Sequence, residues 1–400
     1  MNRYQMQMAP RWWSPQLNGL MVKLWRPVRV RKQVRNERLM EVTVRGAERV
    51  RTLLEEGRAV LITPNHPTHA DAYSVYAAAD EIGVPLYLMT AWQVFSMKSA
   101  LTRQVLRWHG CFSVDREAAD MRAFRQAVEV LERRREPLVV FPEGEVYHCN
   151  GRVRPFREGA AAIALSAAKR DKRPVVCVPC ALWYEYLDDP TEELKGIMND
   201  LEREVLWRPR TDLPLHERIY RFAEVCLVIK ELEFLGRACE GPLPGRILNL
   251  ADKILRSIEA RRGLPPRSGD VPERVKELRH VAIQELEKDG VDEPTRKRVY
   301  EELEDLFLAV QLFSYPGDYV AEKPTVERMA ETLDKFEEDV LNRFSATVRG
   351  RRRVTAAFGE PIPVERPKDR KSATVQLTEL LETSVQRLID QLSGAAPGGR

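Results

Sequence analysis

Residues 59–71 read AVLITPNHPTHAD, and this stretch decides how the chain folds and where its chemistry lies. Ala59-Val60-Leu61-Ile62 is a short apolar run of the kind found in buried strands. His66 and Asp71 follow it, five positions apart. A neutral imidazole can take a proton from an alcohol, and a carboxylate on its far nitrogen fixes the tautomer. The stretch therefore predicts a base and its orienting acid at the end of a strand, with the nucleophile supplied by the substrate's own hydroxyl.

A single His/Asp pair of this kind could equally cap the helix that follows, so further residues are needed to distinguish a catalytic role from a capping role. Three downstream stretches supply them: GCFSVDR at 110–116, LVVFPEG at 138–144 and PVVCVPC at 174–180. In this order, NHPTHAD, GCFSVDR, FPEG and VPC resemble the four motif blocks of the glycerolipid acyltransferase family, the lysophosphatidate-acyltransferase-like enzymes with a His-x4-Asp signature. The resemblance covers roughly residues 45 to 187, and four blocks with family-like gaps rarely arise by chance.

The resemblance implies an O-acyltransferase with His66 as general base and Asp71 as the group that keeps His66 in register. The acyl group would come from acyl-CoA or from an acyl carrier protein. It would go to a hydroxyl of a lysophospholipid or glycerol-phosphate-type acceptor. Because thioesters are already activated, we expect neither a cofactor nor a metal.

The same resemblance assigns acceptor binding, by position, to four residues: Arg116, Glu143, Gly144 and Arg157. A guanidinium can bind phosphate bidentately, although Arg116 could instead pair with Glu117 or Glu143, and Arg157 could be solvated. The family commonly follows Phe-Pro-Glu-Gly with Thr-Arg-Ser, whereas this chain has Glu145-Val146-Tyr147. A carboxylate there would repel an acidic head group. Lysophosphatidate is therefore one candidate acceptor, and another lysolipid or a long-chain alcohol competes with it.

Two alternatives stay open beside the transferase. A metal-dependent hydrolase would collect a cation from histidines and an aspartate, namely His66, His69 and Asp71 with His109 or His148, but its HxHxDH pattern is absent. The non-enzymatic alternative is a lipid-binding scaffold that kept the acyltransferase fold. The intact His/Asp pair and Arg116 argue against that scaffold.

Basic charge is concentrated at one end of the chain. Residues 1–50 hold eleven Lys/Arg and three Glu, a net charge of +8, whereas the whole chain carries +4. Trp12, Trp13 and Trp25 lie in the same segment among aliphatic residues, a mixture suited to an anionic lipid surface. A disordered basic leader or a nucleic-acid arm is the alternative. We expect membrane contact and no nucleic acid, because Trp and aliphatic side chains suit a bilayer interface better than a phosphate backbone.

Composition fits a cytoplasmic protein that is peripheral on the membrane. The chain has 400 residues, of which 44% are hydrophobic and 31% charged, enough to bury a core. No window approaches the roughly 18 consecutive apolar residues that a spanning helix needs. The six cysteines are scattered and no signal peptide is evident, so we expect reduced cysteines in the core.

Alternating strands and helices predict an α/β fold with a mostly parallel sheet flanked by helices. After about Asp188 strand patterns give way to amphipathic helices. By the same resemblance, Val354–Ile362 looks like the strand that usually closes the acyltransferase domain. We therefore expect a large all-helical insertion before the last strand, and a charged helix from Arg116 to about Arg135. The expected segments are a basic Trp-rich membrane-contacting leader (1–44), an acyltransferase α/β domain (45–187 and 346–393), a helical insertion (188–345) and a disordered tail (394–400).

Overall fold

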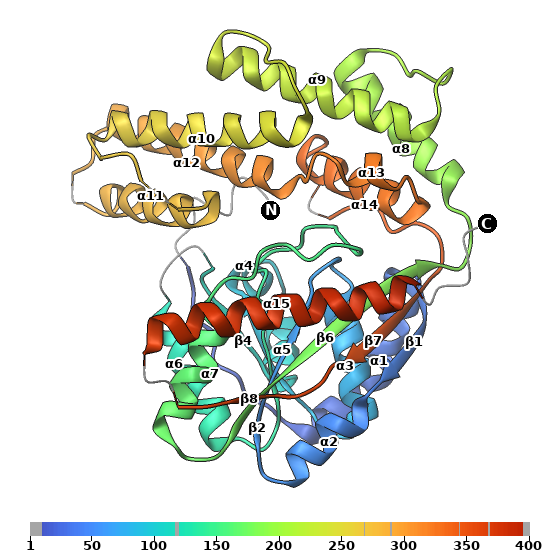
Figure 1. Ribbon diagram of the computed structural model, residues 1–400, viewed down its shortest axis with the longest axis vertical. Helices are drawn as coiled ribbons and strands as arrows, with labels where there is room; N and C mark the ends of the chain where they lie inside the picture. Colours follow the sequence, from blue (N-terminus) through green and yellow to red (C-terminus); the bar gives the residue numbers. More distant parts are fainter. Residues whose placement is uncertain are drawn as a thin grey trace. The chain divides into compact units, whose positions relative to one another are not determined.

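The computed structural model describes residues 10–116, 120–267, 269–288, 290–343, 345–366 and 369–394. These residues form two compact units (Figure 1). The α/β unit comprises Pro10–Asp189 together with Val348–Arg400, and the helical unit comprises Pro190–Thr347. Each unit is described by itself below. The expected tail lies outside the described residues except for Gly394, which ends a helix.

One eight-stranded sheet is the centre of the α/β unit. Its order is β1-β7-β6-β2-β5-β3-β4, with β8 beside β6, and every pair is parallel except β6 with β7 and β6 with β8. The predicted α/β fold with a mostly parallel sheet is confirmed. The strands are β1 (Leu39–Arg45), β2 (Ala59–Pro64), β3 (Tyr87–Ala91), β4 (Cys111–Val114), β5 (Leu138–Val139), β6 (Val175–Tyr186), β7 (Arg352–Phe358) and β8 (Ile362–Val364).

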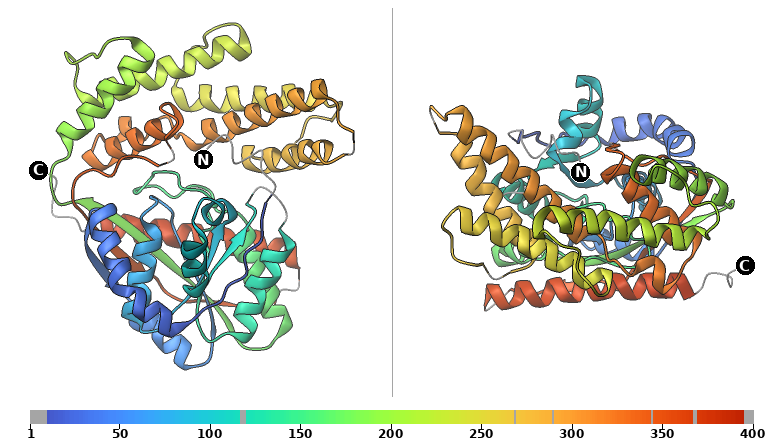
Figure 2. Two further views of the ribbon diagram at one scale, coloured as in Figure 1. Left: turned by 180° about the vertical axis from the view of Figure 1, so that it is seen from behind. Right: turned by 90° about the horizontal axis from the view of Figure 1, so that it is seen from above.

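Helices cover both faces of this sheet (Figures 1 and 2). In β2 every residue is buried: Ala59 and Leu61 pack in the core under α6, α7 and α15, and Val60 and Ile62 pack in the core under α2 and α3. A strand buried on both faces has to be apolar throughout, which explains the unbroken run. The helices of this unit are α1 (Gly19–Asn36), α2 (Ala47–Glu55), α3 (Asp71–Ile82), α4 (Trp92–Ser96), α5 (Ala100–Trp108), α6 (Met121–Arg133), α7 (Gly159–Arg170) and α15 (Arg370–Gly394).

The described part of the expected leader is built into the α/β unit, so the expected boundary at residue 44 needs correction. Strand β1 pairs in parallel with β7, and the α1 side chain of Arg29, which is buried, donates to Asp80 of α3 at 2.6 Å. Trp13 stacks on Phe95 with ring centroids 5.3 Å apart, and its backbone exchanges hydrogen bonds with Ser113. Trp12 and Trp13 therefore pack on the protein itself, because they complete its core at β4.

The helical unit is inserted between two neighbouring antiparallel strands, β6 and β7. Tyr186, shortly before the inserted segment, pairs with Arg352, shortly after it. Arg351 forms a bidentate ion pair with Asp188, and each of its two contacts is 2.7 Å long. The predicted helical insertion before the last strands is confirmed. Its helices are α8 (Thr191–Leu206), α9 (Leu215–Leu235), α10 (Leu243–Arg261), α11 (Val271–Leu286), α12 (Glu293–Ser314), α13 (Tyr319–Glu322) and α14 (Val326–Asp339).

Three successive helix junctions in this unit are closed by the same buried Glu–Arg clasp. In each, a glutamate near the end of one helix binds the arginine at the fourth position of the next helix, and its carboxylate also accepts a backbone N–H of the connecting loop. The pairs are Glu202–Arg218 and Glu231–Arg246 at 2.7 Å and Glu259–Arg274 at 3.0 Å. The loop donors are Arg210, Cys239 and Arg267. The clasp aligns each helix on the one before it, because charged groups removed from water need such partners.

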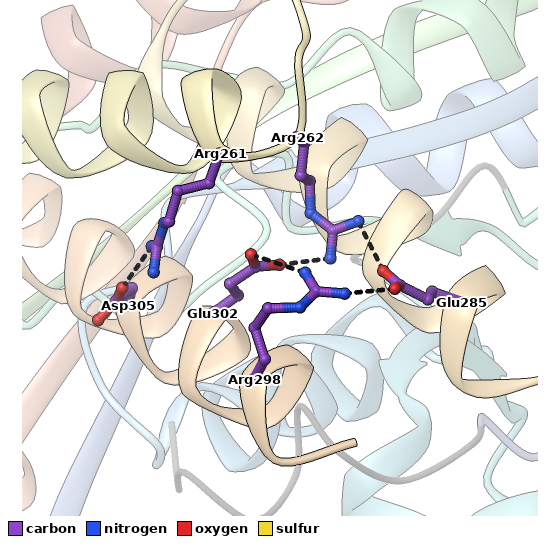
Figure 3. A network of polar contacts seen from close by, with 6 residues as sticks. All are labelled: Arg261, Arg262, Glu285, Arg298, Glu302 and Asp305. Atoms are coloured by element: carbon purple, nitrogen blue, oxygen red, sulfur yellow. Dashed lines mark hydrogen bonds and ion pairs between the residues drawn. The ribbon is translucent and has the colours of Figure 1, made fainter. Parts of the chain in front are cut away.

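A second polar network joins the C-terminal ends of α10 and α11 to α12 (Figure 3). Arg262 and Arg298 both bind Glu285 and Glu302, and Arg261 binds Asp305 at 2.9 Å. The side chain of Glu302 is fully buried. Beside this network, α10, α11 and α12 pack through an apolar core that includes Leu250, Leu278, Val299 and Leu306. The amphipathic character expected of the helices in the insertion is thus confirmed for α12.

Candidate active site

His66 and Asp71 lie together at the carboxyl end of β2, where the chain leaves the sheet and enters α3. His66 Nδ1 is 2.7 Å from Asp71 Oδ2. The Asp71 side chain is fully buried, whereas the His66 side chain remains 21% exposed. Loops at the carboxyl ends of parallel strands are where α/β sheets place their ligands. The predicted spacing therefore brings the imidazole and the carboxylate into direct contact, with the ring open to the outside.

The second oxygen of Asp71 is held by a residue from a distant strand. Tyr184 of β6 donates its hydroxyl to Asp71 Oδ1 at 2.7 Å, and Ser74 of α3 lies 2.6 Å from the same hydroxyl. The backbone N–H of Thr68 adds a third hydrogen bond to the carboxylate, at 3.1 Å. Burial raises the pKa of Tyr184 well above its usual value, so its hydroxyl stays protonated and donates. Asp71 is therefore fixed on both oxygens.

An aromatic ring packed on its face also orients the imidazole of His66. The ring of Phe141, which follows β5, stacks on it with centroids 4.1 Å apart and an interplanar angle of 22°. Because Nδ1 faces Asp71, Nε2 is the ring nitrogen left for a substrate. An imidazole held in this way is suited to proton transfer at Nε2.

Two asparagines anchor the loops of the site to the free edge of β6. Strand β2 pairs with β6 only as far as Pro64 and Cys180. Beyond that point the side-chain amide of Asn65 exchanges two hydrogen bonds with Leu182, and that of Asn150 does the same with Tyr184. Side-chain amides thus replace the missing strand, and Asn65 fixes the backbone directly before His66.

Glu143 is buried between the His66 loop and the segment that follows the Pro-Glu-Gly turn. One of its carboxyl oxygens accepts the His66 backbone N–H at 2.7 Å, and the other accepts the Arg154 backbone N–H at 3.1 Å. Burial raises the pKa of Glu143 to about 8, although both N–H donors favour the charged form. Glu143 therefore ties two loops together.

Arg116, Gly144 and Arg157 meet at this turn, together with Glu145. Arg116 Nη1 donates to Gly144 O at 2.7 Å and lies 3.0 Å from Glu145 Oε2, while Arg157 Nη1 donates to Arg116 O at 2.9 Å. Gly144 has φ of +77°, and a Cβ there would lie 2.6 Å from Arg157 Nε. Only glycine fits this position. All four sequence-predicted acceptor residues are thus brought to one turn.

Arg116 lies in a turn after β4, and not in the charged helix that we expected to begin there. Helix α6 begins at Met121, with Asp120 as its N-cap accepting from the backbone of Arg122 and Ala123. An Asp side chain at this position satisfies N–H groups that a helix start leaves free. The cap at Asp120 therefore leaves Arg116 outside α6, where it reaches the Gly144 turn.

The histidines of the metal-hydrolase alternative do not form a set around His66. His109 is buried; its Nδ1 lies 2.9 Å from Val105 O, and its ring packs edge-on against Tyr76. His69 and His148 pack edge to face, with centroids 5.5 Å apart. His66 and Asp71 use their facing atoms on each other. These contacts give His109 a packing role in the core.

Comparison with known proteins agrees with this geometry. Residues 41–183 match the model of the family described as Acyltransferase. This segment is an acyltransferase-family domain. It contains β2, α3, the Pro-Glu-Gly turn and most of β6, and the predicted family is thereby confirmed for it. The chain is also 28% identical over 175 residues to a glycerol-3-phosphate acyltransferase of Aeromonas hydrophila subsp. hydrophila, a match that covers 40% of this chain and 21% of that protein. The chain thus spans about a fifth of the curated relative that it matches.

Several side chains of the site were not predicted from the sequence. Tyr184, Ser74 and Asn150 lie outside the quoted motif blocks, and Phe141 stands within one without an assigned role. A polar residue at the far end of the apolar strand 175–186 was the available sign for Tyr184, because that end lies at the site. No sign in the sequence marked Asn150, since its partner is backbone.

Proposed function

We propose that this protein is an O-acyltransferase that moves a fatty acyl group from an acyl thioester to a hydroxyl of a lysolipid or glycerol-phosphate-type acceptor. The donor is acyl-CoA or an acyl carrier protein. His66 is the general base, and Asp71 orients its ring and stabilises the imidazolium that forms. The observation that carries the proposal is the 2.7 Å contact between His66 Nδ1 and the buried Asp71, at the carboxyl end of β2 in the segment that matches the acyltransferase family.

In the proposed reaction, Nε2 of His66 takes the proton of the acceptor hydroxyl as its oxygen attacks the thioester carbonyl carbon. Asp71 stabilises the imidazolium that forms. The tetrahedral intermediate then expels the thiolate, the C–S bond breaks, and the proton on Nε2 passes to the leaving sulfur. The products are an ester and a free thiol, so atoms and charge balance.

The acceptor head group is proposed to lie at the Gly144 turn, where Arg116 and Arg157 lie within reach of a phosphate. Glu143 has a different role, because both of its carboxyl oxygens accept backbone N–H groups and are therefore occupied. We assign it to positioning His66, in place of the acceptor contact that the resemblance implies. The His66 N–H is thereby committed to Glu143 and does not serve a tetrahedral oxyanion.

Mass spectrometry of reaction products tests the proposal. The full-length protein is incubated with mixed acyl-CoAs, or with acylated carrier protein, and with mixed lysolipid, glycerol phosphate and long-chain alcohol acceptors. The expected result is a new ester with release of one thiol per ester. Lipid binding without any ester would favour the scaffold, and hydrolysis that needs an added metal would favour the hydrolase.

Tyr184→Phe is expected to lower kcat/KM about tenfold. The hydroxyl removed is a donor that stabilises the Asp71 carboxylate, and a hydrogen bond to a charged group is worth about 1.5–3 kcal/mol. Without it, Asp71 is held by fewer hydrogen bonds and orients His66 less firmly. The measurement is kcat/KM of the variant relative to the wild-type protein.

Tyr76→Phe is the matched control for this prediction. It also removes a buried hydroxyl, whose partners are His109 O and Cys111 Sγ and not Asp71. Loss of a buried hydroxyl alone would lower kcat/KM equally in both variants. A kcat/KM in Tyr184→Phe no lower than in Tyr76→Phe would therefore contradict the prediction.

We further propose that α1 is the part of the N-terminal segment that contacts the membrane. None of the helices among the described residues is both long and apolar enough to cross a bilayer. Leu20, Leu24 and Val28 are 67%, 62% and 41% exposed, and their spacing of four residues places them on one side of α1. Lys23 and Arg31 are exposed beside them. Apolar side chains flanked by cations suit an anionic lipid surface.

Replacing Leu20 and Leu24 together with glutamine is expected to weaken binding to anionic vesicles about 10- to 100-fold, because each leucine loses the free energy of leaving water. Vesicle co-sedimentation is the measurement. The control is Leu232→Gln with Leu248→Gln, two leucines about half exposed on the helical unit. Equal binding by both double variants would reject α1 as the contact. Deleting residues 1–30 is a poorer test, since it would also remove the packing of Trp12 and Trp13.

A further inference from the structure

The ion pair between Arg116 and Glu145 takes no part in the proposed acyl-transfer steps. Arg116 Nη1 lies 3.0 Å from Glu145 Oε2, and the two side chains are 17% and 14% exposed. A pair so shielded from water interacts more strongly than one on the open surface. Glu145 thus offsets the charge of the arginine assigned to the acceptor head group.

The other cations at the turn have fixed places. Arg157 Nη1 donates to Arg116 O, and its guanidinium lies against Gly144. The guanidinium of Arg154 lies over the ring of Tyr147, 5.7 Å from its centroid. Glu145 therefore lowers the net positive charge that the arginines of this turn present to a head group.

We propose that Glu145 makes this site select acceptors whose head group is a phosphodiester over acceptors that carry a phosphomonoester. This inference rests on the proposed function and deepens it. A phosphodiester carries one negative charge and needs less positive charge at the site than a phosphomonoester does. A phosphomonoester carries about −1.5 to −2 at pH 7, and Glu145 repels the additional charge.

Acceptor competition tests the selection. The full-length protein receives one acyl thioester with equal amounts of lysophosphatidylglycerol, a phosphodiester, and lysophosphatidate, a phosphomonoester, and the two products are quantified. The wild-type protein is expected to favour the phosphodiester at least tenfold in kcat/KM. Glu145→Gln keeps the size of the side chain and removes its charge, and it is expected to shift the ratio about 10- to 100-fold toward lysophosphatidate.

Two further variants separate charge from structure. Glu145→Asp keeps the charge and is expected to retain the wild-type preference. Glu81→Gln makes the same chemical change at an exposed position at the end of α3 and is expected to leave the ratio unchanged. A wild-type preference for lysophosphatidate, or a ratio in Glu145→Gln within twofold of the wild-type value, would overturn the proposal.

A binding measurement without an acyl donor keeps this inference distinct from the proposed function. Calorimetry with sn-glycerol 3-phosphate is expected to show at least tenfold tighter binding to Glu145→Gln than to the wild-type protein. Equal affinity would reject the role of Glu145 even if acyl transfer occurs. Tighter binding without acyl transfer to any acceptor would support it while rejecting the transferase.

Discussion

Replacing His66 with alanine is expected to lower the turnover of acyl transfer by about 10²- to 10⁴-fold, the usual contribution of a general base. The side chain removed is the one whose Nε2 would take the proton of the acceptor hydroxyl. Its partner Asp71 is held by Tyr184 and by the backbone of Thr68 without His66. The loop therefore keeps its place in the variant, and the loss falls on catalysis. Initial rates with saturating thioester and acceptor are the measurement.

His216→Ala is the matched control for His66→Ala, because His216 is an exposed histidine at the start of α9 in the helical unit. It is expected to keep full turnover. Thermal unfolding of both variants shows whether the fold is retained. A folded His66→Ala protein with turnover within threefold of wild type would reject His66 as the base, and with it the reaction proposed here.

Breaking one buried clasp of the helical unit is expected to have the second large effect. Glu231→Gln should destabilise the region of α9 and α10 by about 3–5 kcal/mol, since it leaves Arg246 charged and poorly paired in the interior. In the wild-type protein this arginine makes two hydrogen bonds to Glu231, at 2.9 and 2.7 Å, and it holds the pKa of Glu231 below its usual range. Hydrogen exchange of the α9 and α10 peptides measures the effect as faster exchange.

Two further variants make this prediction specific. Glu233→Gln breaks the exposed pair with Lys230 on the same helix and is expected to cost less than about 1 kcal/mol. Replacing Glu231 and Arg246 together with leucine and methionine is expected to restore most of the stability, because no unpaired charge remains. Unaltered exchange in Glu231→Gln would show that the clasp does not hold the junction.

The sheet was predictable because its central strands have a local sequence pattern. Residues 59–62 and 175–178 are apolar without interruption, which only a strand buried on both faces requires. The return of 352–358 to the sheet was predictable from the resemblance of residues 354–362 to the closing strand of the family's domain. The place of residues 10–44 was not, because the contacts that hold Trp12 and Trp13 lie about 100 residues away in the chain and leave no local pattern.

The chemistry of the site was predictable where its residues are close in sequence. His66 and Asp71 stand five apart, and the start of α3 at Asp71 brings them into contact. The partners that complete the arrangement come from other strands. Tyr184 is 113 residues from Asp71, and Asn150 is 34 residues from the backbone that it supports. One sequence does not contain pairings of this kind.

The Glu–Arg clasps were also not predicted, although their arginines recur in the sequence at a regular spacing. The spacing of apolar residues does not show this repeat. Arg218, Arg246 and Arg274 recur every 28 residues, each four positions into a helix. Apolar spacing alone identified the helices as amphipathic. The repeat became visible only when each arginine was seen bound to a glutamate 15 or 16 residues earlier.

Because Tyr186 and Arg352 are paired neighbours, the entire stretch from Pro190 to Thr347 occupies the position of a hairpin turn. A tight turn of a few residues would span the same gap. The strand order would survive such a shortening, since every ladder bond of β6 and β7 lies outside the excised segment. Excision of that stretch would thus yield a minimal form in which the contribution of the helices could be measured by subtraction.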